Sequence, residues 1–74
     1  MTEVSQAYLL GIREGRLLLT SIKARGETVT CTDAQRFFEN ARDNMRRGFT
    51  AEMTDTFRGE RDFWANLISK GIFK

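Results

Sequence analysis

Residues 4–22, VSQAYLLGIREGRLLLTSI, carry small or apolar residues at a regular helical spacing. Steps of four and three residues return to the same side of an α-helix, so these positions form one stripe. The stripe consists of Val4, Tyr8, Gly11, Gly15, Leu18 and Ile22. The pattern predicts a long first helix over about residues 2–25, with Thr2 as candidate N-cap and Gly26 just beyond the end.

Two glycines, Gly11 and Gly15, lie in the middle of this stripe. Each costs a helix about 1 kcal/mol relative to alanine. Their presence favours close approach of a second helix or of a bulky side chain such as Phe38 or Trp64, the alternative being that they are merely tolerated. The same spacing drives dimerisation of helices in membranes, but the charged residues between the glycines exclude a bilayer here.

The second helix is predicted from TDAQ, a capping box in which Thr32 and Gln35 bond to backbone N–H groups at the helix start. It spans about residues 33–47 and meets Gly48 as a stop. The residues between Gly26 and Thr32 are expected to form a connecting loop, because a short strand there would have no second strand to pair with.

A third helix is predicted after Thr50, its favoured N-cap, and ends at Gly71. Because Gly59 weakens it, a start at Thr56 or a bend near Gly59 stays open as an alternative. The apolar stripe of this helix consists of Met53, Phe57, Phe63, Trp64, Leu67 and Ile68.

Together these segments predict a single all-α domain over residues 1–74: a small three-helix arrangement in which the long first helix packs on a helical hairpin. With 74 residues the chain is near the lower size limit for a domain that folds alone. The expected core consists of Leu18, Ile22, Phe37, Phe38, Met45, Phe57, Phe63, Trp64 and Leu67.

Composition limits the chemistry. The chain has one cysteine and no histidine, so it can form no internal disulfide and lacks the usual zinc ligands; no metal or other cofactor is expected. Cys31 is expected to be a buried or neutral thiol. The sequence shows neither a membrane-spanning run nor a signal peptide, which favours a cytoplasmic protein.

The apolar residues predict self-association, most simply a homodimer. Three consecutive leucines, residues 17–19, fan over about 200° of a helix and cannot all face one small core. The first helix and the apolar C-terminal tail are therefore the candidate oligomer interface. Its residues are Gly11, Gly15, Leu18, Leu19, Ile22, Ile72 and Phe73.

The stretch RGERDFW, residues 58–64, places four charges beside the only tryptophan. As an enzyme site it would need convergent groups, but Glu60 and Asp62 are two residues apart and point to different sides of a helix. We expect no enzyme activity. The favoured interpretation is a packing surface with an Arg58–Asp62 pair; the alternative is a partner-binding hot spot built on Arg61 and Trp64.

A cluster of three arginines, Arg42, Arg46 and Arg47, is the best basic patch of a chain whose net charge is +2. It either complements the negative end of the second helix or contacts phosphates of a nucleic acid. Direct reading of a DNA groove is disfavoured, because residues 51–64 would form the recognition helix and carry four acidic residues against only two arginines.

The runs SQAYLLGIREGRLLL and GFTAEMTDTFRGERDFWANLI resemble small early-region proteins of lambdoid bacteriophages and prophages, encoded between the exonuclease and excisionase genes. The resemblance covers about half the chain and carries no catalytic motif. It implies a small helical accessory protein that binds a host or phage protein and influences host physiology or the lysis–lysogeny decision. The alternative function is a small nucleic-acid-binding or transcription-modulating protein.

Overall fold

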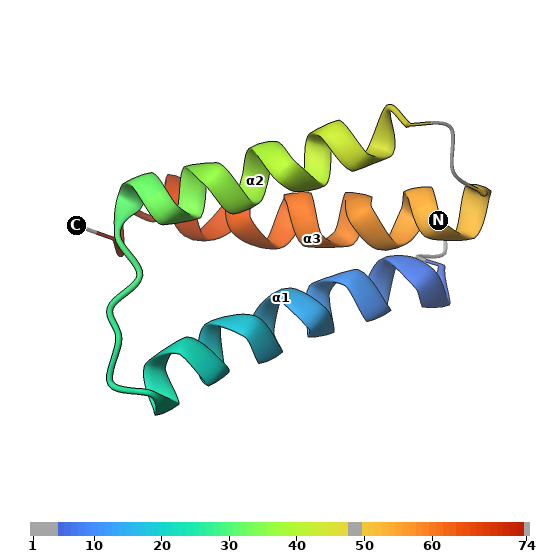
Figure 1. Cartoon of the computed structure of the whole chain (residues 1–74). Helices are drawn as coiled ribbons and strands as arrows, with labels where there is room; N and C mark the ends of the chain where they lie inside the picture. Colours follow the sequence, from blue (N-terminus) through green and yellow to red (C-terminus); the bar gives the residue numbers. More distant parts are fainter. Residues whose placement is uncertain (1–4, 48–49, 74) are drawn as a thin grey trace.

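A computed structural model describes residues 5–47 and 50–73 and shows three α-helices (Figure 1). They are α1 over Gln6–Ala24, α2 over Cys31–Met45 and α3 over Ala51–Ser69. α1 and α3 run in the same direction, α2 runs opposite to both, and α3 packs against each of the other two. The predicted all-α architecture, with the first helix packed on a helical hairpin, is confirmed.

α1 begins later than predicted. Its N-cap is Ser5, whose hydroxyl oxygen accepts a hydrogen bond from the Tyr8 backbone N–H at 3.1 Å. The predicted cap Thr2 and the stripe residue Val4 lie outside the described residues. The C-terminal end agrees with the prediction, because the left-handed backbone of Gly26, with φ +77°, turns the chain out of the helix.

α2 begins two residues before the predicted capping box. Thr30 is the N-cap: its hydroxyl oxygen accepts from the Asp33 N–H at 3.1 Å, and Asp33 accepts from the Thr30 N–H at 3.2 Å. Val29, just before the cap, and Ala34, four residues after it, are both buried in the same apolar cluster. This hydrophobic staple explains why the box forms at Thr30 rather than Thr32.

α3 begins after the predicted N-cap, Thr50, which accepts from the Met53 N–H at 3.3 Å. It continues through Gly59 without a second start at Thr56 and ends before Gly71, whose φ is +67°. The predicted stop of the second helix, Gly48, lies outside the described residues.

The crossing of α1 and α3 is a contact between two backbones. A Cβ atom on Gly11 would overlap the Thr56 carbonyl oxygen and lie 2.9 Å from the Glu60 nitrogen. A Cβ atom on Gly59 would overlap the Tyr8 carbonyl oxygen. Only glycine allows this approach, and both glycines are buried.

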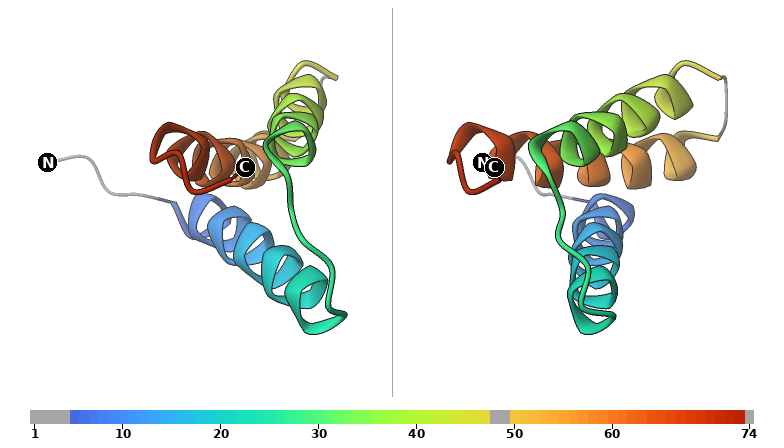
Figure 2. Two further views of the ribbon diagram at one scale, coloured as in Figure 1. Left: turned by 90° about the vertical axis from the view of Figure 1, so that its left-hand side faces the viewer. Right: turned by 60° about the vertical axis from the view of Figure 1, so that its left-hand side comes forward.

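Beyond the crossing α1 diverges from α3, and residues 25–30 lead back to α2 (Figure 2). Phe63 fills the beginning of this widening space: a Cβ atom on Gly15 would lie only 2.6 Å from Phe63 Cδ2. The bulky side chain at Gly15 is therefore Phe63 rather than Phe38 or Trp64.

The core lies between the diverging helices α1 and α3, at the end that residues 25–30 close (Figure 2). Its buried residues are Ile22, Val29, Ala34 and Trp64, with Leu19, Phe37, Phe38, Phe63, Leu67, Ile68 and Phe73 partly buried against them. Met45 and Phe57 are also only partly buried. The prediction of Leu18 as a core residue is wrong, since its side chain is 39% exposed.

None of the three helices in the described part of the chain combines the length and apolar character that a membrane span requires.

Candidate functional site

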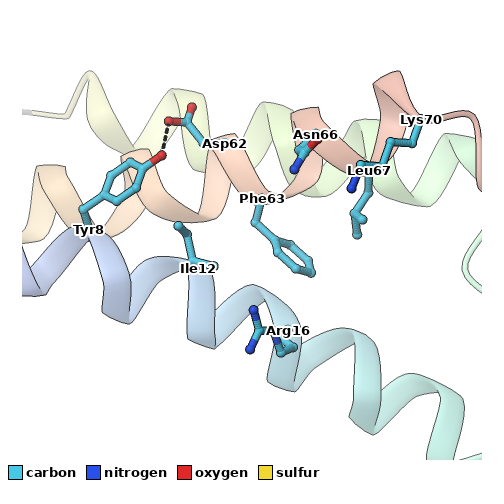
Figure 3. A pocket seen from close by; sticks show the side chains of 8 residues that line it. All are labelled: Tyr8, Ile12, Arg16, Asp62, Phe63, Asn66, Leu67 and Lys70. Atoms are coloured by element: carbon cyan, nitrogen blue, oxygen red, sulfur yellow. Dashed lines mark hydrogen bonds between the residues drawn. The ribbon is translucent and has the colours of Figure 1, made fainter. Parts of the chain in front are cut away.

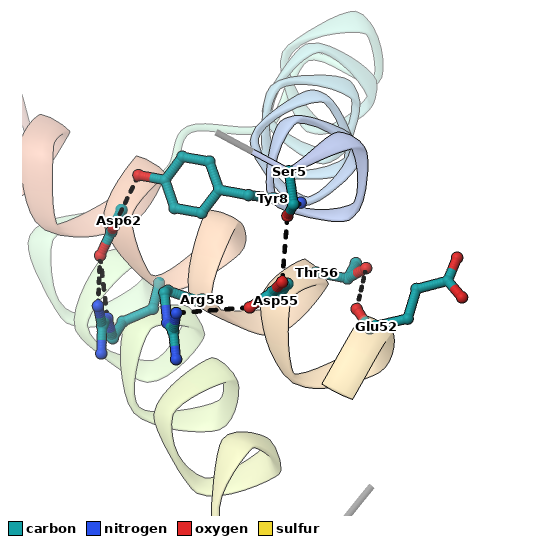
Figure 4. Close-up of polar contacts among 8 residues, drawn as sticks. Ser5, Tyr8, Glu52, Asp55, Thr56, Arg58 and Asp62 are labelled. Carbon is teal, nitrogen blue, oxygen red and sulfur yellow. Dashed lines mark hydrogen bonds and ion pairs between the residues drawn. The ribbon is translucent and has the colours of Figure 1, made fainter. Parts of the chain in front are cut away.

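A hydrogen-bonded cluster joins α1 to α3 at the edge of their interface (Figure 4). The Tyr8 hydroxyl donates to Asp62 Oδ2 at 2.7 Å, and Arg61 donates to Asp62 Oδ1 from Nε at 3.0 Å and from Nη2 at 2.8 Å. Nearer the start of both helices, the Ser5 hydroxyl donates to Asp55 at 3.1 Å. These contacts tie the two helices together beside the glycine crossing.

The predicted pairing of Arg58 with Asp62 is wrong. Arg58 instead pairs with Asp55, three residues earlier, at 3.4 Å. The Asp62 carboxylate is already bound by Tyr8 of α1 and by Arg61, the residue that precedes it in α3. RGERDFW is therefore mainly a packing surface: its glycine forms the crossing and its aromatic residues enter the core.

Three titratable groups near this interface are perturbed. Partial burial alone would raise the pKa of the Asp62 carboxyl, but hydrogen bonds from Tyr8 and Arg61 outweigh it and hold that pKa below its ordinary value. The same hydrogen bond, with some desolvation, raises the pKa of the Tyr8 hydroxyl. Burial, followed by repulsion from Glu14, raises the pKa of Glu60.

A groove lies between α1 and α3 on the Tyr8–Asp62 side, and we call it the α1–α3 groove (Figure 3). Its volume is about 540 Å³, within the range of ligand-binding clefts. Apolar side chains from both helices lie beside polar and charged ones. The lining residues are Tyr8, Ile12, Arg16, Asp62, Phe63, Asn66, Leu67 and Lys70.

Trp64, a candidate partner-binding residue, is only 2% exposed and cannot form a surface hot spot. Its ring packs against Phe37 at 4.8 Å, Phe63 at 5.1 Å and Phe73 at 6.2 Å between centroids. Arg61, the other half of that hypothesis, is partly exposed and bonded to Asp62.

Three of the predicted oligomer-interface residues, Gly11, Gly15 and Ile22, are buried within a single chain. They are used by packing of α1 on α3 and on the core, which leaves them little surface for a second copy. Leu19 is partly buried against the same core.

The side of α1 turned away from α3 keeps an apolar surface, which we call the outer leucine face. Leu10 and Leu17 form its centre and are 47% and 54% exposed. Leu9 lies at one edge of it and is 50% exposed; Leu18, 39% exposed, follows Gly11 and Gly15 in the stripe, beyond the point where α1 diverges from α3 (Figure 2). A hollow of about 180 Å³ beside Leu9 and Leu10 is completed by Gln6 and Arg13. Of these four leucines only Leu18 was among the predicted interface residues.

The C-terminal tail splits between core and surface. Phe73 packs against the buried cluster, whereas Ile72 is 55% exposed. Ile72 therefore remains available for a partner and Phe73 is largely used within the chain.

The arginine cluster at the end of α2 is exposed at all three positions, Arg42, Arg46 and Arg47. Arg42 also lies 5.9 Å from the centre of the Phe38 ring and 3.9 Å from Asp43 Oδ1. The cluster is thus accessible, but one of its charges is partly balanced by a neighbour.

Two further observations concern chemistry. Cys31 is exposed at the first turn of α2, so of the predicted alternatives, a buried or a neutral thiol, the buried one is wrong. Within residues 5–47 and 50–73, no three His, Cys, Asp or Glu side chains gather closely enough to hold a metal ion.

No family model, no curated protein and no solved structure matches this chain.

Proposed function

We propose that this protein is a non-enzymatic, cytoplasmic protein-binding module that acts as a homodimer through the outer leucine face. The observation that carries the proposal is the exposure of Leu10 and Leu17, each about half accessible, on the side of α1 that the fold leaves unused. Clustered exposed leucines favour association, because burying each removes apolar surface from water.

The charges between these leucines support pairing with a second copy. Arg13 and Glu14 are exposed, and neither is in an ion pair with another described residue. They lie on opposite edges of the face and only about 1.5 Å apart along the helix axis. Two copies of α1 packed in parallel about a two-fold axis therefore place Arg13 of each beside Glu14 of the other.

This orientation has its own test. The variants Arg13→Glu and Glu14→Arg are each expected to dimerise more weakly than the wild type, because each places like charges together. An equimolar mixture is expected to form the heterodimer in preference to either homodimer, measured by native mass spectrometry. A random mixture of species would rule out the parallel arrangement.

We extend the proposal to a host or phage protein as the partner of the dimer, with a regulatory effect on host physiology or on the lysis–lysogeny decision. The resemblance of the two end segments to lambdoid early-region proteins supports this setting. The exposed Ile72 and the partly exposed Arg61 add to the available surface.

A pull-down from bacterial lysate, with and without nuclease, tests the partner class. The double variant Leu10→Glu/Leu17→Glu is expected to lose a captured protein that the wild type retains after nuclease treatment. Met53→Glu is the control, since it also places a glutamate at an exposed apolar residue, 43% accessible, but on α3. Capture that disappears with nuclease would overturn the protein-partner proposal.

Nucleic-acid binding is the second candidate, favoured by the exposure of Arg42, Arg46 and Arg47 together at one end of α2. If this function holds, binding to bare DNA or RNA falls steeply with added salt, and the triple change of these arginines to glutamine removes it. Retained binding by that variant would contradict an arginine-cluster site.

A further inference from the structure

The α1–α3 groove combines an apolar floor with charges of one sign that remain unpaired. Ile12 from α1 and Phe63 and Leu67 from α3 contribute the apolar part of its lining. Arg16 of α1 and Lys70, the C-cap of α3, are exposed and line the groove. Neither forms an ion pair with a described residue.

The acidic residue in this lining is neutralised by its surroundings. Asp62 accepts two hydrogen bonds from Arg61 and one from the Tyr8 hydroxyl. The free charge of the groove is therefore positive, which favours an anionic ligand. Asn66 adds an amide that can donate to a carboxylate or a peptide carbonyl.

The shape of the groove favours a peptide over a small free acid. Its lining runs along α3 from Asp62 to Lys70, about 12 Å at the rise of an α-helix. About half of the lining is polar, whereas small-molecule pockets are lined mainly by apolar side chains that enclose the ligand. An amphipathic segment can place one bulky side chain on the apolar floor and its acidic residues beside Arg16 and Lys70.

We infer that the α1–α3 groove binds an acidic peptide segment of a partner protein, with a phenylalanine or leucine side chain on Phe63 and Leu67 and carboxylates at Arg16 and Lys70. This deepens the proposed protein-binding function and rests on it for the class of partner. It uses a different side of α1 from the outer leucine face.

The test is a titration of ¹⁵N-labelled protein with a synthetic capped peptide in which phenylalanine and leucine are four residues apart and glutamates fill the other positions. A matched peptide carries lysine in place of every glutamate. With the glutamate peptide, NMR shifts are expected at Ile12, Phe63 and Leu67, and not at Leu10 and Leu17. The lysine peptide is expected to leave the groove unchanged.

Charge reversal in the groove provides the variants. Arg16→Glu/Lys70→Glu is expected to weaken binding of the glutamate peptide by about tenfold or more. Lys23→Glu/Arg36→Glu is the matched control, because it reverses two exposed positive charges outside the groove and is expected to bind as the wild type does. Equal binding by all three proteins would overturn the inference.

The remaining outcomes are also decisive. No groove shift with the glutamate peptide at about 1 mM, or equal shifts with the lysine peptide, would overturn the inference. Shifts confined to Leu10 and Leu17 would overturn it while supporting the outer leucine face. Conversely, NMR shifts of the groove residues that persist in Leu10→Glu/Leu17→Glu support peptide binding in the groove whether or not the dimer exists. Either proposal can therefore be contradicted without the other.

Discussion

Replacing Gly59 with alanine separates the two effects that this glycine combines, helix propensity and backbone contact. In an isolated helix the change stabilises the helical state by about 1 kcal/mol. In this fold the added methyl group would overlap the Tyr8 carbonyl oxygen and lie 3.0 Å from the Ile12 nitrogen. Both neighbours are backbone atoms, so no side-chain rotation relieves the overlap and α1 must move away from α3.

The steric effect is expected to exceed the propensity gain. Overpacking costs about 1–3 kcal/mol, and here the cost is expected at the upper end, about 2–3 kcal/mol, because the displacement also strains the Tyr8–Asp62 hydrogen bond beside the crossing. After subtraction of the propensity gain, the free energy of unfolding is expected to fall by about 1–2 kcal/mol. For a domain of this size the midpoint of thermal unfolding then falls by roughly 5–15 °C.

Gly11→Ala is expected to behave in the same way, because its added carbon would overlap the Thr56 carbonyl oxygen. The double variant is expected to lose less than the sum of both effects, since the first alanine already separates the helices at the shared crossing. Gly15→Ala is expected to cost less than either, because it meets the Phe63 ring, which can shift.

Thermal unfolding followed by circular dichroism, at one protein concentration for all variants, measures these effects. Thr20→Ala is the control: Thr20 is exposed on α1, so alanine adds helix propensity without a new contact and is expected to be neutral or slightly stabilising. If Gly11→Ala and Gly59→Ala both raise the midpoint as Thr20→Ala does, the backbone crossing of α1 and α3 is refuted.

Three further changes test the local contacts by urea unfolding. Tyr8→Phe is expected to lose about 1 kcal/mol at neutral pH, because it removes the 2.7 Å bond to Asp62. The lowered pKa of Asp62 means that this loss shrinks as the pH falls through that pKa; a pH-independent loss would contradict the assignment. Thr30→Ala is expected to lower the free energy of unfolding by about 1 kcal/mol and Thr32→Ala by less than about 0.5 kcal/mol. The reverse order would assign the N-cap of α2 to Thr32 instead of Thr30. Because burial and a nearby carboxylate raise the pKa of Glu60, its ionised form opposes folding above that pKa. Glu60→Gln is therefore expected to have a higher free energy of unfolding than the wild type at neutral pH, and this difference is expected to disappear in acid. Equal stability at neutral pH would contradict the claim that ionised Glu60 opposes folding.

Helix number and most helix ends could be predicted from local signals. Gly26, Thr50 and Gly71 act within one turn of their own position, through a left-handed backbone or a side-chain cap. The start of α2 was missed because two capping boxes overlap. Val29 distinguishes the two boxes, since only a cap at Thr30 has an apolar residue just before it, Val29, and another four residues after it, Ala34.

The pairing of helix faces could be predicted only in part. The stripe on α1 correctly indicated a close approach at Gly11, but its partner, Gly59, is 48 positions away and was treated only as a weak point of α3. The five steps of the stripe average 3.6 residues, the helical repeat, and Ile22 at its end is buried. Leu18 is nevertheless at the surface, because α1 diverges from α3 beyond the crossing (Figure 2), while Leu19 packs on the core.

The candidate site needed the three-dimensional arrangement for the same reason. The α1–α3 groove joins residues from opposite ends of the chain, such as Ile12 and Leu67, and no spacing rule relates them. Similarly, the exposure of the outer leucine face follows from which side of α1 meets α3. The abundance of leucine predicted self-association, and the glycines assigned to that interface pack against α3 within the chain.

Sedimentation equilibrium over a range of micromolar concentrations tests the outer leucine face most directly. The wild type is expected to rise with concentration from the 8.5 kDa monomer toward twice that mass, and Met53→Glu is expected to follow it. Leu10→Glu/Leu17→Glu removes about 1 kcal/mol for each of four half-exposed leucines in the dimer, which weakens association about a thousandfold and leaves a monomer. A wild-type protein that stays at 8.5 kDa at every concentration, or a double variant that associates as the wild type does, would contradict the proposed dimer.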